Sequence, residues 1–357
     1  MKHSYFAASS FIHHKNSLMK QRSFYLSALL VVLLCINCAV AQTGSGLQVV
    51  KTFHIASAGG WDYLAVSPIS NSLYVSHGTQ VNVLDKNSGD SIGVIPNTIG
   101  VHGIAFAPEF GKGFTSNGRS NSVTVFDIKS NQILDSIKTG ENPDAIMFEP
   151  YSKKIITCNG RSHDLSIIDP SNNTVVATVP LDGKPETAVS DADGKVYVNI
   201  EDKSEISKVD MQTNKVETTW SISPGESPSG LAIDRKTHRL FAGCDNKLLV
   251  VVNADNGKVV AQLPIGDGCD GTGFDAGLNY VYASCGEGIL TVIKEQSSDQ
   301  YAVLDNVQTK RSARTCSVDE KTHEVFLSAA DLQPNTPAGT RPQMIPGTFQ
   351  VLVVGKK

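Results

Sequence analysis

The sequence lacks the short motifs by which the commonest catalytic and cofactor sites are identified. It contains no G-x-S-x-G nucleophile turn and no G-x-x-x-x-G-K-[ST] phosphate-binding loop. After residue 41 it has no C-x-x-C or C-x-x-C-H, which mark redox and haem-attachment sites. The D-x-[DN]-x-[DN]-G spacing of calcium loops is also absent. Any activity therefore depends on a site assembled from residues that are distant in the sequence.

Long apolar runs are also missing, except for one near the N-terminus. That run extends from Phe24 to Ile36, follows four basic residues and no acidic one, and precedes Ala39-Val40-Ala41. A basic flank, a short apolar stretch and small residues are typical of a secretory signal peptide. We predict that residues 1–41 are this signal peptide, with Met19 as an alternative start, and that residues 42–357 are periplasmic or secreted.

A lipid anchor is the alternative to a freely exported protein. It would use Cys35 or Cys38 as the acylated residue. Leu34 and Asn37 are bulky or polar where processing requires a small residue, so this alternative is disfavoured. We expect no transmembrane segment after cleavage.

The charge of residues 42–357 differs from that of the whole chain. Four of the 31 Lys and Arg residues lie in the leader, so 27 basic residues remain against 35 Asp and Glu. The net charge of this part is therefore near −8. Generic nucleic-acid binders are basic, and this balance disfavours a nucleic-acid partner.

The number of cysteines after residue 41 is odd, which leaves at least one thiol unpaired. We interpret these cysteines mainly as small buried side chains, with a Cys269–Cys285 or a Cys244–Cys269 bridge as alternatives. The five residues are Cys158, Cys244, Cys269, Cys285 and Cys316.

A repeat of about 42 residues runs through the chain. Glycines that close a strand recur at intervals of 41, 40, 43, 42 and 43 residues, at Gly59, Gly100, Gly140, Gly183, Gly225 and Gly268. An acidic residue after a strand recurs at Asp85, Asp127, Asp169 and Asp210. Repeats of this length indicate solenoids, propellers or arrays.

Each repeat contains four short strands and no sustained helical period. In the third repeat the expected strands are 145–148, 154–157, 165–168 and 175–179, separated by residues that favour turns. Four strands per repeat describe one propeller blade. Seven repeats begin near Gly60, Val101, Pro143, Pro185, Pro228, Cys269 and Ala313. We therefore predict an all-β, seven-bladed β-propeller with four-stranded antiparallel blades.

The last repeat supplies only three strands, and the N-terminal segment supplies the fourth. Leu47 to Ile55 has the character of an outer strand, and Thr348 to Val354 is the last strand of the chain. Pairing the two would satisfy two exposed sheet edges and close the ring. Residues 42–357 would then form a single domain, which we expect to be a monomer.

The strands resemble those of a known family. Leu73-Tyr74-Val75-Ser76, Val196-Tyr197-Val198-Asn199 and Val281-Tyr282-Ala283-Ser284 are similar to the YVTN repeats of YncE-like β-propeller proteins of bacteria. The resemblance covers about residue 47 to the C-terminus. It implies the propeller fold and an exported location, and it implies varied functions, including single-stranded DNA binding in some members.

The propeller geometry predicts which residues meet at the mouth of the central channel. In each blade the first strand lines the channel, so the residues that open these strands converge. We call them the mouth residues: Asp62, His102, Asp144, Glu186, Ser229, Asp270 and Arg314. Such a ring suits a small polar ligand. Alternatively, it is a solvated rim whose carboxylates cap nearby amides.

A divalent cation is the cofactor that this ring could hold. The carboxylates of Asp62, Asp144, Glu186 and Asp270 would be its ligands, and a cation there could act as a Lewis acid in a hydrolase or lactonase. No cofactor is evident from a motif.

Loops on the same face add further candidate ligand-binding residues. Arg119 and Arg161 occupy the near-identical segments 116–120 and 158–162, where arginine pairs suit a carboxylate or phosphate or bond neighbouring rim carboxylates. His163 and His77 lie in comparable loops, and local hydrogen bonding is the simpler role for both. Trp61 flanks Asp62 and could stack on a planar or sugar-like ligand, or pack between blades.

The seventh repeat has a long loop in place of a tight turn. It runs from about Ala329 to Pro346 and is rich in proline. Such a loop is typical of a lid, a partner-binding arm or a disordered insertion. We expect it to lie over the channel mouth.

These observations favour an exported binding or scaffold propeller with no catalytic role assigned. A small polar ligand or a protein partner would engage the charged mouth. The metal-dependent hydrolase or lactonase is the second hypothesis and single-stranded DNA binding the third.

Overall fold

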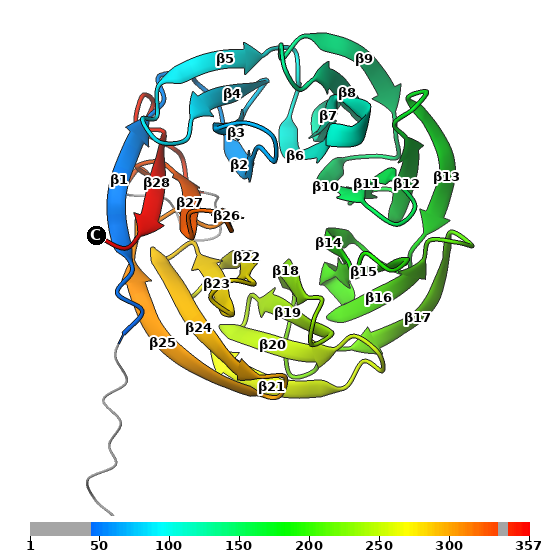
Figure 1. Cartoon of the computed structure of the whole chain (residues 1–357), viewed down its shortest axis with the longest axis vertical. Helices are drawn as coiled ribbons and strands as arrows, with labels where there is room; N and C mark the ends of the chain where they lie inside the picture. The colour runs from blue at the N-terminus through cyan, green and yellow to red at the C-terminus, as the bar shows by residue number, and fades with distance from the viewer. Residues whose placement is uncertain (1–43, 335–341) are drawn as a thin grey trace, which may run out of the picture. The chain divides into compact units, whose positions relative to one another are not determined.

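Seven antiparallel sheets arranged in a ring make up the protein (Figure 1). The computed structural model describes residues 44–334 and 342–357. The predicted signal peptide, its alternative start at Met19 and the lipid-attachment alternative lie outside these residues. Within the described ranges, no helix has the length and apolar character needed to cross a membrane.

Every blade has four strands, which confirms the predicted seven-bladed propeller. The innermost strands are β2 (Trp61–Val66), β6 (Val101–Ala107), β10 (Pro143–Glu149), β14 (Pro185–Ser190), β18 (Pro228–Asp234), β22 (Cys269–Asp275) and β26 (Cys316–Asp319). The second strands are β3 (Ser72–His77), β7 (Lys112–Asn117), β11 (Lys154–Asn159), β15 (Lys195–Ile200), β19 (Arg239–Cys244), β23 (Tyr280–Cys285) and β27 (Glu324–Ala329).

The remaining strands lie farther from the channel. The third strands are β4 (Gln80–Asp85), β8 (Ser122–Asp127), β12 (Asp164–Asp169), β16 (Glu205–Asp210), β20 (Leu248–Asn253), β24 (Ile289–Ser297) and β28 (Gln350–Gly355). The outer strands are β5 (Ser91–Ile95), β9 (Ile133–Lys138), β13 (Thr174–Pro180), β17 (Lys215–Ser221), β21 (Val259–Pro264), β25 (Gln300–Gln308) and β1 (Gln48–His54). The short 3-10 turns are η1 (Pro108–Phe110), η2 (Gly118–Ser120) and η3 (Glu201–Lys203).

The first and last strands of the chain close the ring. β1 lies antiparallel beside β28, from the pair Gln48↔Gly355 to the pair His54↔Gln350 (Figure 1). The pairing confirms the closure predicted from the sequence. It covers the outer edge of β28 and ties the start of the chain to its end in one sheet.

The hydrophobic core lies between neighbouring blades. Tyr74 of the first blade stacks on Phe126 of the second, with ring centroids 5.8 Å apart. Phe241 of the fifth blade stacks on Phe274 of the sixth in the same way, at 5.4 Å. Each blade therefore buries its apolar faces mainly against its two neighbours.

The acidic repeat has a local structural cause. Asp85, Asp127, Asp169 and Asp210 each end a third strand, and one carboxylate oxygen of each accepts hydrogen bonds from groups two or three residues ahead. Asn253 does the same in the fifth blade, accepting from the Asp255 amide at 2.8 Å. These bonds fix the turn to the outer strand. The bond from the Ser171 hydroxyl holds the pKa of Asp169 down at about 2, and the bond from Lys195, followed by that from the Thr213 amide, does the same for Asp210.

This turn can be tested in the third blade. We expect Asp169→Ala to lower the free energy of unfolding by about 1 kcal/mol, since the Ser171 amide and hydroxyl lose their acceptor. Asp169→Asn keeps an acceptor, as Asn253 does, and should lose less. Urea unfolding of the two variants measures the difference. Equal losses would show that the carboxylate charge, and not the turn, is what matters.

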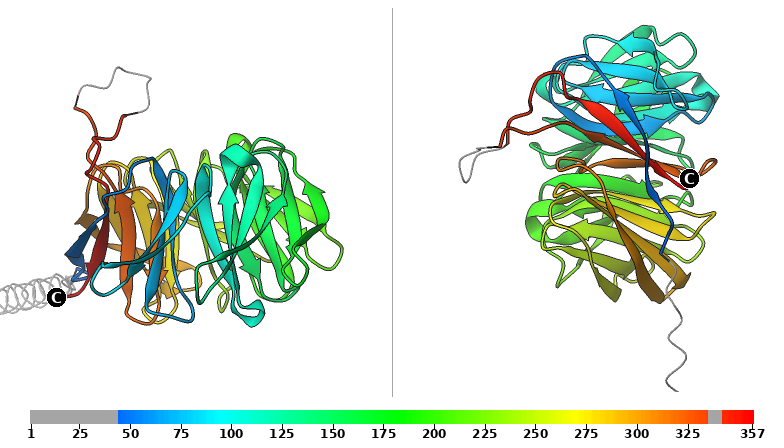
Figure 2. Two further views of the ribbon diagram at one scale, coloured as in Figure 1. Left: turned by 90° about the horizontal axis from the view of Figure 1, so that it is seen from above. Right: turned by 90° about the vertical axis from the view of Figure 1, so that its left-hand side faces the viewer.

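The loop of the seventh blade projects from one face of the ring (Figure 2). It follows β27, which ends at Ala329, and precedes β28, which begins at Gln350. Leu332 and Met344 form an isolated bridge at its base. The long loop predicted from about Ala329 is thus a β27–β28 hairpin whose two described arms are paired.

All five cysteines of the described chain are free thiols. Cys269 and Cys285 are register partners on β22 and β23, yet no bridge joins them or joins Cys244 to Cys269. Burial raises the pKa of Cys244 and of Cys316 to about 12. These thiols are therefore protonated at neutral pH and weakly nucleophilic.

Candidate functional site

The mouth residues converge where the inner strands begin. The turn that joins the second and third strands of each blade folds back onto the segment that leads into the first. Gly118 donates its amide to the Gly100 carbonyl, and Gly286 donates to Gly268, both at 2.8 Å. Gly100 has φ +70°, and a Cβ there would lie 2.9 Å from the Arg119 amide nitrogen, so this close approach requires glycine. Both sets of loops therefore share one face.

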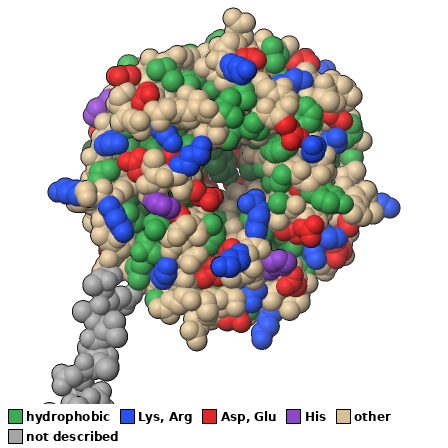
Figure 3. All heavy atoms as spheres, in the orientation of Figure 1, with side chains coloured by type: hydrophobic (Ala, Val, Ile, Leu, Met, Phe, Trp, Pro, Cys, Tyr) green, Lys and Arg blue, Asp and Glu red, His purple; other side chains and the backbone are tan. Residues whose placement is uncertain are grey.

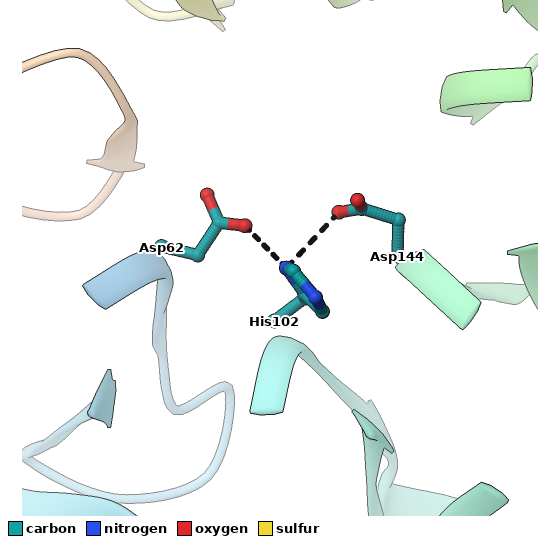
Figure 4. Close-up of side chains that lie close together, drawn as sticks. All are labelled: Asp62, His102 and Asp144. Carbon is teal, nitrogen blue, oxygen red and sulfur yellow. Dashed lines mark hydrogen bonds and ion pairs between the residues drawn. The ribbon is translucent and has the colours of Figure 1, made fainter. Parts of the chain in front are cut away.

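Three mouth residues form one compact group (Figure 4). Asp62, His102 and Asp144 are the second residues of β2, β6 and β10, on three consecutive blades. His102 Nδ1 lies 2.6 Å from Asp62 Oδ2 and 3.5 Å from Asp144 Oδ1. A single imidazole nitrogen thus faces two carboxylates.

The ring continues past Asp62 to the sixth and fifth blades. The Arg314 guanidinium bonds Asp62 Oδ1 at 3.3 Å and pairs closely with Asp270. Asp270 also accepts a hydrogen bond from the Ser229 hydroxyl. The charge of Arg314 is therefore shared between two carboxylates.

Glu186 of the fourth blade is held by its own cation. Lys184 Nζ lies 3.0 Å from Glu186 Oε2 and also pairs with Glu201. The neighbouring carboxylates raise the pKa of Lys184 against the opposing effect of burial, so the lysine stays charged. The Glu186 carboxylate is thus paired with a lysine. Asp144, on the first strand of the neighbouring blade, pairs with no Lys or Arg of the described chain.

Burial and mutual repulsion favour protonation at this mouth. Burial, followed by the nearby Asp62 charge, raises the pKa of Asp144 to about 8. Burial alone would lower the pKa of His102, but the hydrogen bond to Asp62 and the surrounding carboxylates raise it overall. At neutral pH Asp144 therefore favours a protonated form that an exposed Asp does not, and His102 keeps its proton to a higher pH than an exposed His.

Buried polar side chains of the second strands fix the backbone at the mouth. The Ser328 hydroxyl donates to the Asp62 carbonyl at 2.9 Å, and the Ser284 hydroxyl donates to the Ala313 carbonyl at 3.2 Å. Ser116 bonds the Asp144 carbonyl, and the Asn199 amide bonds the Ser229 carbonyl. We call these residues the inter-blade belt, because each one reaches the next blade.

Tyr63 links two blades that are far apart in the ring. It follows Asp62 on β2, and its hydroxyl lies 3.4 Å from the Thr187 hydroxyl on β14 of the fourth blade. Its ring packs with the cluster that contains Ala145 and Val198. Burial and the charges of Asp144, Glu186 and Asp62 raise its pKa well above the usual value, so the phenol stays neutral. Tyr63 thus lies beside the charged group as an apolar neighbour.

A cavity of about 610 Å³ borders the mouth at the seventh blade. Arg314 and the backbone of Gly59, Gly60 and Gly286 contribute its polar wall. Apolar side chains cover the opposite wall, contributed by Trp61 and by Leu332, Pro342 and Met344 of the hairpin. The described arms of the hairpin therefore border this part of the mouth.

Three of the predicted ligand-binding residues do not join the ring. Arg119, Arg161 and His163 are exposed on the loops of the second and third blades. No ion pair joins either arginine to any residue of 44–334 or 342–357, so the expected bonding to rim carboxylates is not observed. His163 has φ +56°, the left-handed geometry that Asn121 and Ser204 adopt at corresponding turns. The turn thus accounts for its position.

His77 has the local structural role expected for it. Its ring stacks on Phe349 with centroids 3.9 Å apart and bonds Ser57 Oγ at 2.6 Å and the Gly59 carbonyl at 2.8 Å. Burial lowers its pKa from 6.5 to about 4. The folded protein therefore keeps this imidazole neutral.

The buried His77 predicts a loss of stability in mild acid. Between pH 7 and pH 5 the unfolded chain binds a proton at this residue that the folded protein does not, which costs about 1 kcal/mol. His77→Gln should shrink the difference between urea midpoints at the two pH values. The exposed His163→Gln is the matched control and should leave that difference unchanged. An equal difference in all three proteins would refute the assignment.

Sequence reasoning missed the residues that act through neighbouring blades. Lys184 precedes Glu186 by two residues. Its pairing with Glu186 can be recognised only after Glu186 has been placed at the channel mouth. Tyr63 and the inter-blade belt have no signal within one repeat, because their partners lie in other blades. Only the ring geometry brings these pairs together.

Solved structures resemble the fold, whereas the comparisons by sequence found no match. No protein-family model matches the chain, and no curated protein matches it. A solved structure titled Kuenenia stuttgartiensis Hydrazine Synthase superposes with a TM-score of 0.67 at 16% identity, over 77% of this chain and 94% of that one. The structure of U3-55K superposes with a TM-score of 0.72 at 10% identity, over 86% and 98%. These likenesses support the propeller fold alone, and membership of the YncE-like family stays a prediction.

Proposed function

We propose that the protein is a binding propeller whose ligand is a small, partly apolar organic molecule. The ligand occupies the cavity between Trp61, Arg314 and the β27–β28 hairpin. A single observation carries the proposal, namely a cavity of about 610 Å³ that joins an apolar wall to the charged mouth. Concave sites with apolar walls and a few fixed polar groups are the usual form of small-molecule sites.

The charge around Arg314 narrows the class of ligand. The guanidinium is already paired with Asp62 and Asp270, so this part of the mouth has no excess positive charge. A carboxylate or phosphate would face both of those carboxylates. A neutral acceptor such as an amide, ketone or hydroxyl meets the remaining guanidinium N–H groups without that repulsion. We therefore favour a neutral ligand over an anion.

A nucleic-acid partner has less support than a small molecule. Binding to single strands depends on a continuous basic surface. On the face turned away from the hairpin, basic and acidic side chains are interspersed around the central hollow (Figure 3). A protein partner at the hairpin is the alternative to a small ligand. The export of residues 42–357 to the periplasm or beyond belongs to the same proposal, on the sequence argument alone.

Tryptophan fluorescence can test the cavity directly. The chain has two tryptophans, and Trp220 lies on the outer strand β17. In a Trp220→Phe background, Trp61 is the single reporter, and we expect neutral amides or polyols with an apolar part to shift its emission. Native mass spectrometry of protein isolated from its own cells should show a retained small molecule.

A cavity variant provides the control. Met344→Ala removes an apolar wall and should weaken the fluorescence response roughly tenfold, whereas Val176→Ala on the exposed outer strand β13 should not change it. A retained molecule that persists unchanged in Met344→Ala would place the ligand elsewhere. An unliganded wild-type protein that gives no Trp61 response would contradict the proposal.

A further inference from the structure

We propose that Asp62, His102 and Asp144 bind one divalent transition-metal ion, of the Zn²⁺ or Mn²⁺ class, at the channel mouth. The site does not depend on the ligand proposed for the hairpin cavity, although Arg314 both bonds Asp62 and lines that cavity. It also differs from the four-carboxylate site expected from the sequence, because it includes a histidine and omits Glu186 and Asp270.

The first argument is the donor set. The Asp62, His102 and Asp144 side chains offer one ligand atom each, and all three atoms lie within 4.8 Å of one another. Two carboxylate oxygens and one imidazole nitrogen suit borderline first-row ions, which accept both donor types. No sulfur donor is present in the group, so the site does not favour soft ions.

The second argument is the spacing of the donors. Two ligands that each lie about 2.1 Å from a tetrahedral ion are about 3.4 Å apart. His102 Nδ1 and Asp144 Oδ1 already lie 3.5 Å apart. The contact of Nδ1 with Asp62 Oδ2, at 2.6 Å, must lengthen to admit the ion, and the third donor pair already lies within 4.8 Å.

The third argument is that one buried carboxylate oxygen of the group lacks a hydrogen-bond donor. Asp144 Oδ1 is buried and accepts no hydrogen bond within the described structure, and the one cationic group that it faces there is His102 Nδ1, 3.5 Å away. The other carboxylates of the mouth have cations of their own, Lys184 for Glu186 and Arg314 for Asp270. A buried carboxylate oxygen without a donor is costly, and a cation between Asp144 and Asp62 would satisfy it.

The fourth argument is that the backbone holds the donors in place without the ion. The Asp62 amide donates to the Ser76 hydroxyl at 3.1 Å, and the Asp62 carbonyl accepts from Thr315 and Ser328. Ser116 of the second blade bonds the Asp144 carbonyl of the third. Gly118 leaves room for the imidazole, because a Cβ there would lie 2.7 Å from His102 Nε2. The three donors are therefore fixed before binding, which favours affinity.

Metal titration of the stripped protein tests the site. The full-chain protein is treated with EDTA, freed of chelator and titrated with Zn²⁺ or Mn²⁺ by calorimetry, with elemental analysis of the product. We expect one ion per chain. His102→Ala and Asp144→Asn should each lower the affinity by roughly 100-fold or more, because each removes a direct ligand. Wild-type protein that retains no ion would overturn the proposal.

A second histidine–carboxylate pair supplies the matched control. His323 Nδ1 lies 2.7 Å from Asp275 Oδ2, and Asp275 is fully buried, but among residues 44–334 and 342–357 no third donor joins them. His323→Ala should therefore leave both stoichiometry and affinity unchanged. An equal loss in His323→Ala and His102→Ala would show that the binding is adventitious and refute the site.

A measurement on the wild-type protein avoids any folding defect in the variants. Mn²⁺ broadens the NMR signals of nearby nuclei, so the His102 ring signals should disappear first on titration, before those of His163 and His238. Broadening that begins at another histidine would overturn the assignment. Met344→Ala should bind metal normally, so a failure of the ligand proposal and a failure of the metal proposal can be told apart.

Discussion

Lys86→Met is expected to destabilise the protein by about 3–5 kcal/mol, because it leaves a carboxylate buried without its cation. Lys86 follows β4 of the first blade, and its ammonium group pairs with Asp319, the last residue of β26 in the seventh blade. Both side chains are more than nine-tenths buried. Burial raises the pKa of Asp319, but the bonds from Lys86 and from the Lys321 and Thr322 turn lower it overall. Urea unfolding measures the loss.

A double variant tests whether the loss of stability comes from the unpaired carboxylate. In Lys86→Met/Asp319→Asn the buried charge is gone, and an acceptor remains for the Lys321 amide, which lies 3.0 Å from Asp319 Oδ1. We expect this protein to recover most of the stability lost in Lys86→Met. If the double variant is no more stable than the single one, the loss does not come from the uncompensated carboxylate.

Phe53→Ala is expected to cost about 3–5 kcal/mol, the usual range for a buried phenylalanine. Phe53 lies on β1 and packs with Phe326 and Phe349 of its own blade and with Leu73 of the first blade. Its ring also covers Gly89, where a Cβ would lie 2.2 Å from the ring atom Cδ1. The substitution therefore opens a cavity at the joint where the ring closes.

Thermal unfolding compares this variant with an exposed one. Val176→Ala changes a side chain that is 50% exposed on an outer strand, and its effect should be within about 0.5 kcal/mol. A similar effect of the two substitutions would mean that closure by β1 contributes little to the stability of the ring.

The fold could be predicted almost completely from the sequence because each blade repeats its local signals. The third blade shows the agreement, since its predicted strands lie within two residues of the observed bounds of β10 to β13. The aspartates that mark the repeat do so for a local reason, as caps of one turn. Patterns of this kind involve only a few neighbouring residues, so they can be recognised in the sequence alone.

The site could be predicted only in part, because its pairings depend on side-chain reach across blades. The sequence identified the mouth residues, and the ring brings Asp62 to His102 and Arg314 to Asp270. The sequence could not show that Lys184 pairs with Glu186. Nor could it show that Arg119 and Arg161 lie outside the ring of mouth residues. Cys269 and Cys285 are a further example. The strand register places them opposite each other, but it does not determine whether they form a disulfide, and both are free thiols.

The strand pairing that closes the ring also orders the folding of the chain during synthesis. Gln48 has its partner at Gly355, so β1 emerges from the ribosome first and must wait for almost the whole chain before it can pair. The first six blades are contiguous in the sequence and can form as they appear, whereas the seventh cannot. The incomplete chain is therefore an open arc of blades with two exposed edges. β1 stays unpaired for longest, so chaperones that bind unpaired strands have the most time to bind β1.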